Sequence, residues 1–515
     1  MAEGRAVVLK ANGSGMRWAP GQTTIPHSGF RLVGAIVGQV LLATAAFMLL
    51  PMVADLYYDN RDWLAFGMAS LVSAACGSAL SWGYWRSGGK WGKSGLTLRQ
   101  AFALTPLSWA AVSAVSALPF LFSEHPQLRG HLANAFFEAI SGITTTGATV
   151  MTGLDTAPPG LLLWRGLLQW MGGIGIIATA IAILPALGVG GMQLFRTESS
   201  DRSQKAMPRV RQIASTIGYA YIGLTVVAGV AYWLAGMRPF DAIVHALTSI
   251  ATGGFSTSDQ SFGRWQDNGV QWLATLFMLS GTLPFVLYVR FLAGDRRAFF
   301  DRQVKSLLGL LAVSVGGIGT WLAASGQYGF EQAYRYAAFS VVSVVTTTGY
   351  AVTDYGQWGA AIVGVFFLLT FVGGCTGSTS GGIKIFRFEV MAVMLRVHFL
   401  RLLYPNGVFP RSYDGKPLSD EVIGSVVAFL TVFLLCYAVI TVVLLGLGLD
   451  FLTSASGAAT ALSNVGPGLG ETIGPAGTFA SLPSAAKWVL SFAMLLGRLE
   501  LFTVLIIFLP RFWRG

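Results

Sequence analysis

The chain has 515 residues, of which 54% are hydrophobic and only 11% are charged, and its mean hydropathy is +0.62. This composition excludes an ordinary soluble domain and is typical of a protein that crosses the membrane many times. The formal net charge of +11 would suit a nucleic-acid partner. The basic residues, however, gather in loops between apolar stretches, where they indicate membrane orientation instead.

A polar tail, residues 1–30, lacks the layout of a cleaved signal peptide. Ten apolar stretches near the bilayer-spanning length of about 20 residues follow it. These predicted spans are 31–54, 63–85, 99–122, 160–187, 210–236, 269–293, 304–325, the longer interrupted stretch 357–400, 421–448 and 485–510. All but seven of the 34 Lys and Arg residues fall on one side of this topology. The positive-inside rule therefore predicts that both termini are cytoplasmic.

Four other apolar segments are too short to cross the bilayer and are better interpreted as re-entrant half-helices. They are His131–Ser141, Phe240–Ile250, Glu331–Val345 and Asp450–Leu462. Each lies on the predicted outer side and leads directly into a glycine loop. Asp241 and Asp450, at the starts of two of them, are expected to complement the helix dipole.

The order span, half-helix, glycine loop and span thus repeats four times in one orientation, which predicts pseudo-symmetry about an axis along the membrane normal. We predict an all-α polytopic membrane protein with four pseudo-symmetric repeats around one ion pore and two additional N-terminal transmembrane helices. The predicted divisions are the tail 1–30, the extra two-helix unit 31–98, and repeats at 99–195, 196–295, 296–416 and 417–515.

The four glycine loops are the main candidate site. The predicted filter residues are Thr145, Thr146 and Gly147; Ala251, Thr252 and Gly253; Thr347, Thr348 and Gly349; and Asn464, Val465 and Gly466. A half-helix entering from outside directs its partly negative C-terminal end toward the membrane centre, which favours a cation. Backbone carbonyls in such loops can replace the water around a potassium ion. The alternative is a set of Gly/Thr turns at helix ends, which a single loop of this kind would favour.

A carboxylate follows each loop within eight residues, and the four together could form an anionic outer vestibule that concentrates cations. These residues are Asp155, Asp259, Asp354 and Glu471. The alternative is that they are ordinary polar residues of exposed loops.

The stretch 357–400 is broken by ten residues rich in glycine and hydroxyls. They are Gly373, Gly374, Cys375, Thr376, Gly377, Ser378, Thr379, Ser380, Gly381 and Gly382. Irregular backbone at membrane depth is tolerated where it borders an aqueous path. A kinked helix packed through small residues is the alternative. In the last span, Arg498 is an intramembrane charge with a predicted function, unless it pairs with a carboxylate such as Glu138.

The chain resembles the TrkH and KtrB family of potassium-uptake proteins over nearly its whole length, and the two extra N-terminal spans favour the TrkH branch. The motifs that carry the resemblance are Ile-Thr-Thr-Thr-Gly-Ala at 143–148, Ala-Thr-Gly-Gly-Phe-Ser-Thr at 251–257, Thr-Thr-Thr-Gly-Tyr at 346–350 and Ser-Asn-Val-Gly-Pro-Gly at 463–468. In this family a glycine in each loop accompanies potassium selectivity, and serine at the first position accompanies sodium permeation in some plant relatives. This chain has Gly147 there.

The resemblance implies more than the residues show. It identifies 373–382 as an intramembrane loop that obstructs the pore and moves on opening, and Arg498 as a basic residue that projects into the pore below the filter. It implies a homodimer in a bacterial inner membrane, with a cytosolic TrkA-type nucleotide-binding partner on the basic inner loops. No nucleotide-binding motif occurs in the chain itself, so we expect no intrinsic cofactor and potassium as the only bound metal ion.

Two functional hypotheses follow. The first is a potassium-selective uptake channel or channel-like transporter that also moves rubidium. The second is a secondary symporter coupled to protons or sodium, which would alternate access. An enzyme is not expected, because the sequence lacks a paired acid and base or a ligand cluster with useful spacing.

Overall fold

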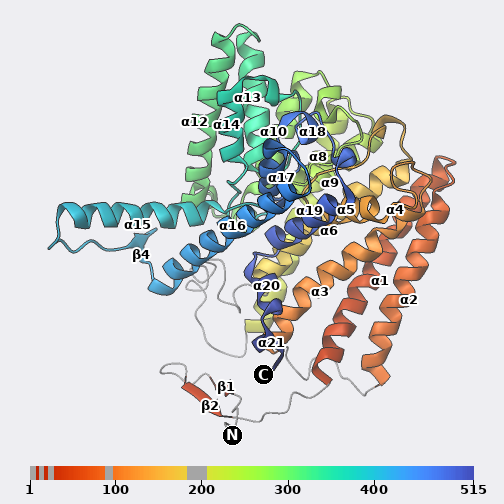
Figure 1. The fold of residues 1–515 in the computed structure, drawn as a ribbon, viewed down its shortest axis with the longest axis horizontal. Coiled ribbons are helices and arrows are strands. Elements are labelled where there is room, and N and C mark those ends of the chain that lie inside the picture. Colours follow the sequence, from red (N-terminus) through yellow and green to blue (C-terminus); the bar gives the residue numbers. More distant parts are fainter. Residues whose placement is uncertain (1–6, 11–16, 21–27, 87–96, 183–205, 515) are drawn as a thin grey trace.

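The computed structural model describes residues 7–10, 17–20, 28–86, 97–182 and 206–514, and these residues are mostly helical. Two short antiparallel strand pairs accompany the helices. They are β1 (Val7–Lys10) with β2 (Arg17–Pro20), and β3 (Ser412–Tyr413) with β4 (Lys416–Pro417). In Figure 1, helix α1 (Ser28–Tyr57) begins near the place where α21 (Pro510–Arg514) ends.

The extra unit is a hairpin of two long helices, α1 (Ser28–Tyr57) and α2 (Trp63–Arg86), at one side of the molecule (Figure 1). Its Asp55 is buried, and one carboxylate oxygen accepts the backbone N–H of Gly160 at 2.6 Å. A carboxylate at a helix N-terminus meets unpaired N–H groups and the positive end of the dipole. Asp55 therefore attaches the extra unit to the second span of the first repeat.

Each repeat has a first span, a half-helix and a second span. The helices of the first two repeats are α3 (Leu98–Ser116), α4 (Leu118–Phe122), α5 (Leu132–Ile143) and α6 (Pro159–Ala182), then α8 (Ala206–Leu234), α9 (Pro239–Ile250), α10 (Asn268–Thr282) and α11 (Phe285–Leu292). Those of the last two are α12 (Arg302–Ala324), α13 (Phe330–Val345), α14 (Ala360–Leu369) and α15 (Ile385–Leu403), then α16 (Asp420–Gly446), α17 (Phe451–Ser463), α18 (Gly470–Ile473), α19 (Ser484–Arg498), α20 (Phe502–Leu505) and α21 (Pro510–Arg514).

The four predicted half-helices correspond to α5, α9, α13 and α17, whose bounds differ from the predicted ones by at most two residues. Asp241 lies in the first turn of α9, and Asp450 caps α17 by accepting the N–H of Thr453 at 3.0 Å. The hydrogen bonds from Thr453 hold the pKa of Asp450 below its usual range. The division predicted between residues 195 and 196 lies outside the described residues, so that boundary stays a prediction.

Close packing holds the half-helices against the second spans. In three repeats a glycine of the second span faces a backbone carbonyl at the C-terminal end of the half-helix. A Cβ at Gly172, Gly281 or Gly497 would lie 2.7 Å or less from that oxygen. Any larger residue would therefore push the half-helix away from its span.

By length and composition, seven described helices can cross a membrane, and nine spans result if two bent helix pairs are included. The predicted spans 269–293 and 485–510 correspond to these two bent pairs, and the bends were not predicted. Helices α10 and α11 meet at 93°, and α19 and α20 meet at 110°. The first bend has a local cause, because Pro284 lacks an N–H and forces the residue before it out of the helical region.

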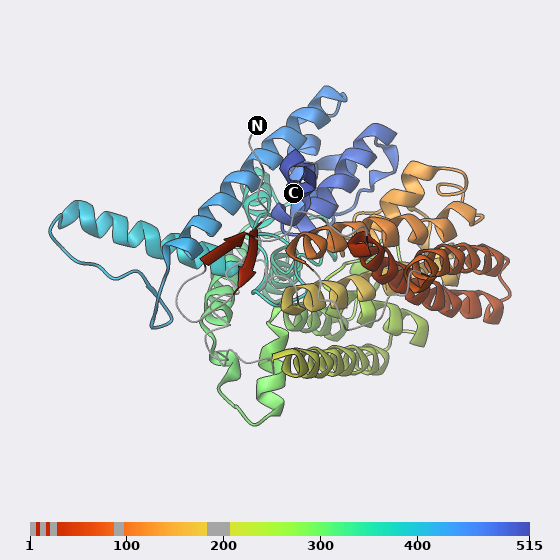
Figure 2. The same ribbon diagram turned by 90° about the horizontal axis from the view of Figure 1, so that it is seen from below.

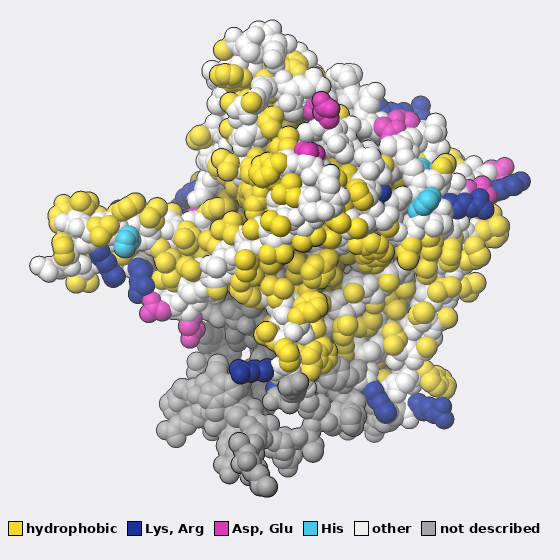
Figure 3. Space-filling model, in the orientation of Figure 1, with side chains coloured by type: hydrophobic (Ala, Val, Ile, Leu, Met, Phe, Trp, Pro, Cys, Tyr) yellow, Lys and Arg dark blue, Asp and Glu magenta, His cyan; other side chains and the backbone are white. Residues whose placement is uncertain are grey.

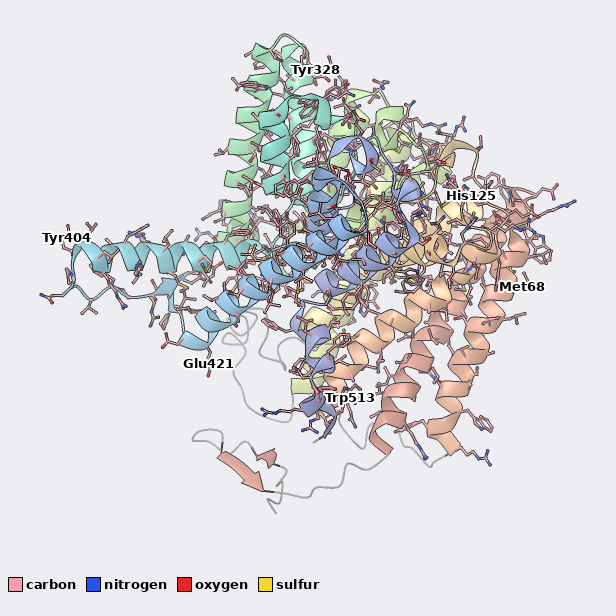
Figure 4. All side chains as sticks on the ribbon, in the orientation of Figure 1. Met68, His125, Tyr328, Tyr404, Glu421 and Trp513 are labelled. Atoms are coloured by element: carbon pink, nitrogen blue, oxygen red, sulfur yellow. The ribbon has the colours of Figure 1, made fainter. Side chains whose placement is uncertain are left out.

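The tenth predicted span, 357–400, is not among these nine. Helix α14 lies beside α13, whereas α15 contacts α12 and α16, then leaves the body sideways and ends near Tyr404 (Figures 1, 2 and 4). The break between them was predicted, but the change of direction was not.

The surface agrees with a membrane environment. Hydrophobic side chains cover most of the middle of the face in Figure 3, while Lys and Arg side chains lie at its lower edge and along α15. Tyr328, between α12 and α13, lies at the opposite end of the molecule from Trp513 (Figure 4). The described helices thus form a body with an apolar belt between two more polar ends.

Candidate functional site

The four glycine loops share one backbone conformation. In each loop a non-glycine residue in the left-handed region is followed, two positions later, by a glycine with positive φ. These pairs are Thr145 and Gly147, Thr252 and Gly254, Thr347 and Gly349, and Asn464 and Gly466. Positive φ in a β-branched threonine costs roughly 1–3 kcal/mol and persists only where the surroundings impose it. Three strained threonines at equivalent places indicate a functional constraint.

The same four glycines bring the loops together in a closed ring. A Cβ on Gly147 would collide with the Gly253 carbonyl oxygen of the second loop, and the pattern continues around the chain. The other collisions are Gly254 with the Thr348 oxygen, Gly349 with the Val465 oxygen and Gly466 with the Thr146 oxygen, all at 2.6 Å or less. Each loop therefore touches the next in order, and the fourth returns to the first.

This ring corrects the predicted register of the second loop. Gly254, and not Gly253, has the place of Gly147, so the equivalent residues are Thr252, Gly253 and Gly254. Ala251 is the C-cap of α9 in right-handed conformation. The prediction failed because two adjacent glycines offer two registers, which differ only in the folded backbone, where Gly254 has positive φ and contacts Thr348 of the third loop.

Side chains behind the ring hold the loops in place. Glu138 of α5 accepts from the hydroxyl of Thr149 at 2.9 Å and from the N–H of Val150 at 2.9 Å. It also forms an ion pair with Arg165 of α6 at 2.8 Å, and both side chains are almost completely buried. Arg165 in turn donates to the Ser256 carbonyl at 2.8 Å. This pair joins the segments that follow the first and second loops.

The next turn of α6 contributes Gln169, which is fully buried. Its Nε2 donates to the Gly253 carbonyl at 2.6 Å, and its Oε1 accepts from the Phe255 N–H at 3.0 Å. Gln169 therefore bonds to the second loop on both sides of Gly254.

The loops also bond to one another and to neighbouring half-helices. The amide of Asn464 donates to the Thr146 hydroxyl at 3.0 Å, which connects the fourth loop to the first. The hydroxyl of Tyr350 bonds to Thr248 of α9, which connects the third loop to the second half-helix. Neutral hydrogen bonds of this kind contribute about 1 kcal/mol each, and leaving a partner unpaired costs more.

The ten-residue break forms a compact intramembrane loop. Its two ends pair with each other, because Gly373 N–H donates to the Ile383 carbonyl at 2.9 Å and Ile383 N–H donates to the Phe371 carbonyl at 3.0 Å. The pairing is so close that a Cβ on Gly373 would overlap the Gly381 oxygen. The alternative of a merely kinked helix is therefore wrong for this segment.

The tip of the intramembrane loop is docked on the second repeat and on the ring. The Thr379 hydroxyl donates toward the carbonyls of Ile250 at 3.1 Å and Gly281 at 2.9 Å, and accepts from the Thr252 hydroxyl at 3.1 Å. Gly381 N–H donates to the Thr347 hydroxyl at 2.7 Å. Thr252 and Thr347, each the first residue after the C-cap of α9 or α13, thus bind this loop through their hydroxyls.

Arg498 lies against the intramembrane loop. Its guanidinium donates to the Thr379 carbonyl at 2.8 Å and to the Gly172 carbonyl of α6 at 3.3 Å, and the side chain is only 3% exposed. The alternative pairing with Glu138 is wrong, since Glu138 pairs with Arg165. Among the described residues Arg498 has no carboxylate partner within ion-pair distance, so its charge is not neutralised by direct contact.

Further charges surround this position. Lys384 donates to the Ser380 carbonyl, next to the carbonyl that Arg498 holds, and Arg387 forms an ion pair with Glu500. A small pocket of about 40 Å³ is lined by the intramembrane loop together with Lys384, Arg498 and Glu500. Glu500 therefore neutralises Arg387, and the other two cations, Lys384 and Arg498, bind loop carbonyls.

The four vestibule candidates lie on exposed or half-exposed loops, and three of them have structural partners. Asp155 pairs with Arg264, Asp259 accepts the N–H groups of residues 153 and 154, and Asp354 accepts the N–H of Gly356 at 2.9 Å. Glu471 lies in the first turn of α18. Structural roles in the outer loops thus explain three of these four carboxylates, in agreement with the alternative interpretation.

Sequence reasoning missed Arg165 and Gln169. The signal was available, because two polar residues four positions apart in an apolar span lie on one helix face. Such residues in a membrane helix normally face protein or water and have a function. Only Arg498 was considered in this way.

The chain was compared with known families, proteins and structures. The family model TrkH, described as a cation transport protein, matches residues 77–313 and 323–514. The chain belongs to the TrkH family. Members are transport proteins, so the expectation that the chain is not an enzyme is confirmed.

Individual relatives cover almost the whole chain. The Trk system potassium uptake protein TrkI of Halomonas elongata is 48% identical over 97% of both chains. TrkH of Salmonella typhimurium is 36% identical over 94% of this chain and 99% of that protein. The crystal structure of the potassium transporter TrkH from Vibrio parahaemolyticus aligns with a TM-score of 0.86 at 34% identity, covering 94% of this chain and 99% of the other. The predicted fold class of this TrkH-family chain, a polytopic all-α membrane protein, is thereby confirmed.

Proposed function

We propose that this TrkH-family chain is the membrane subunit of a bacterial potassium uptake system and moves potassium, and rubidium as its surrogate, through the ring of four loops. The observation that carries the proposal is the closed ring itself, in which a positive-φ glycine of each loop touches a carbonyl of the next. The Trk potassium uptake relatives support the choice of ion.

The electrostatics of the ring favour a cation. Helices α5, α9, α13 and α17 all end directly at the ring, so their partly negative ends converge there. In our proposal the carbonyls of the loops replace the hydration shell of the ion. No side chain beyond Cα fits at the four glycines, which suits a narrow passage.

The intramembrane loop is proposed as the gate, with Arg498 as the barrier beside it. Thr379 and Gly381 bind residues immediately adjoining the ring, and the uncompensated charge of Arg498 would repel a permeating cation. Opening would require this loop to give up those contacts. The two carbonyls at Thr379 and Ser380 now bind Arg498 and Lys384, and both would then be free.

Exposed carboxylates on the opposite side are proposed to attract cations to the entrance. Asp155, Asp259, Asp354 and Glu471 would act together through their field, while three of them also hold the loops. This effect weakens as salt screens the charges.

The assembly is proposed to be a homodimer in the inner membrane with both termini cytoplasmic. Basic residues on the inner loops orient the chain and offer a docking surface for a separate cytosolic TrkA-type nucleotide-binding subunit. Several of those basic residues, including Arg196, Arg202 and Lys205, lie outside the described residues.

The deciding experiment measures rubidium uptake into liposomes that contain only this purified chain, with sodium as competitor. We expect saturable uptake driven by the ion gradient alone, inhibited by potassium and weakly by sodium. Gly147→Ser should lower this preference, since its side chain would overlap the Gly253 carbonyl. Equal sodium uptake by the wild type would refute selectivity, and uptake that requires a proton or sodium gradient would favour the symporter.

A further inference from the structure

One of the four loops lacks a side chain that the others possess. Between the two positive-φ residues of each loop lies one further residue. It is Thr146 in the first loop, Gly253 in the second, Thr348 in the third and Val465 in the fourth. The Thr146 hydroxyl bonds to that of Thr144 at 2.7 Å, and the Thr348 hydroxyl bonds to that of Thr346 at 2.7 Å. Val465 is buried in an apolar cluster. These side chains therefore pack into the protein behind the ring.

Gln169 occupies the corresponding space behind the second loop. A Cβ on Gly253 would lie 2.8 Å from Cγ of Gln169 and closer still to its carboxamide. The glutamine is fully buried, and within the described part of the chain its side chain bonds only to this loop, through the Gly253 carbonyl and the Phe255 N–H. A side chain from the second span thus takes the place of the missing filter side chain.

The replacement makes one carbonyl of the ring different from its equivalents. Among the described residues the carbonyls of Thr146, Thr348 and Val465 accept no hydrogen bond, whereas the Gly253 carbonyl accepts one from the Gln169 amide at 2.6 Å. A carbonyl that already accepts a hydrogen bond is fixed in position and has less acceptor capacity left for an ion. The ring therefore has three free carbonyls and one restrained carbonyl at this level.

We infer that Gln169 is a specificity-determining positioning residue of the ion filter. It keeps the second loop at a fixed distance from the other three by holding the Gly253 carbonyl and the Phe255 N–H. A restrained loop resists closing around the smaller, more strongly hydrated sodium ion, so the restraint favours potassium. The inference rests on the proposed function, because it requires that the ring is the ion path.

The test compares rubidium and sodium uptake by the full-length chain in liposomes for three variants. Gln169→Ala removes both hydrogen bonds and should lower the rubidium-to-sodium ratio about tenfold. Gln169→Glu keeps the shape and the acceptor for Phe255 but loses the donor to Gly253, and should also lower the ratio. The double variant Gln169→Ala with Gly253→Thr fills the same space with a threonine side chain from the loop itself, as in the first and third loops. It should restore part of the lost rubidium-to-sodium ratio.

Gln271→Ala is the matched control. Gln271 is a buried glutamine on the second span of the next repeat, and it bonds to the Trp265 carbonyl and Arg335 instead of a glycine loop. Its replacement should leave the ion ratio unchanged even if it lowers thermal stability. Monodispersity and unfolding temperature, measured for every variant, separate misfolding from altered selectivity.

The outcomes distinguish the inference from the proposed function. A wild-type ratio near one refutes the proposed function, and the inference fails with it. A selective wild type with unchanged ratios in Gln169→Ala and Gln169→Glu overturns the inference alone. If the alanine variant does not accumulate, the isosteric glutamate variant decides, because an unaltered ratio there excludes a role for the Gly253 hydrogen bond.

Discussion

At the residue scale, glycine is required in the four loops for two independent reasons. Positive φ favours a residue without Cβ, and the neighbouring loop's carbonyl leaves no room for one. In the second loop, both reasons apply to only one of the two adjacent glycines. Gly254 has positive φ and faces the backbone of Thr348, while Gly253 faces only the side chain of Gln169.

We therefore predict that Gly254→Ala abolishes rubidium uptake and that Gly253→Ala only reduces it. The Gly254 substitution collides with backbone that cannot move, whereas the Gly253 substitution displaces a side chain. Uptake into liposomes by the two purified variants checks this order. Greater damage from Gly253→Ala would restore the register that the sequence alone suggested.

Arg498 is the second decisive residue, and Arg498→Ala should raise rubidium uptake several-fold. The substitution removes an uncompensated buried charge and the hydrogen bond that holds the Thr379 carbonyl. Initial uptake rates measure the effect. Arg290→Ala provides a control, because Arg290 is exposed and pairs with Asp295 near the end of α11. An unchanged rate in Arg498→Ala would mean that the arginine does not face the ion path.

At the element scale, the intramembrane loop is a closed unit that backbone and side-chain hydrogen bonds attach to the second and third repeats. Thr379 forms the largest share of them through its hydroxyl, and the loop ends are joined by Gly373 and Ile383. An element whose two ends are paired can be released as a body once its docking contacts break. Its attachment beside the sharply bent α10 and α11 places it next to the second repeat.

Thr379→Val should accordingly favour the undocked loop and raise basal uptake about fivefold or more, since two or three hydrogen bonds near 1 kcal/mol each are lost. The valine has nearly the same volume, so packing is preserved. Thr370→Val is the control, because among the residues that the structure describes the Thr370 hydroxyl bonds only to the Phe366 carbonyl of the preceding helical turn. Equal uptake by the two variants would contradict the assigned role of the loop.

At the scale of the whole molecule, the repeats are joined by buried polar contacts outside the ring. The ion pair of Glu138 and Arg165 connects the first half-helix, its second span and the segment after the second loop. Removing one partner of a buried pair leaves an uncompensated charge, which typically costs about 3–5 kcal/mol. Stability and filter geometry therefore depend on the same pair.

Arg165→Met should lower stability by about that amount, and the double variant Arg165→Met with Glu138→Met should recover part of the loss. The measurement is the unfolding midpoint of the purified protein in detergent. No destabilisation by Arg165→Met would show that the ion pair does not contribute net stability. A larger loss in the double variant would assign the effect to packing instead of charge.

Hydropathy, basic-loop asymmetry and local residue type were enough to predict the helical membrane fold, the four half-helices and the order of elements. These properties depend on stretches of about 10 to 30 residues in contact with lipid or water, and so they can be read locally. The importance of Arg498 and the break at 373–382 were also apparent, because a charge or a run of glycines is unusual inside an apolar span.

Only the tertiary structure decided which partners these residues choose. The register at Gly254 and the place of Gln169 behind Gly253 depend on residues more than eighty positions away, and Glu138 pairs with a residue on a different helix. The residues next to each position in the sequence do not show which residues of other helices and loops it will contact. A chain of this composition therefore determines that it spans a membrane as four repeated units, while packing between those units determines how the four loops close into one ring.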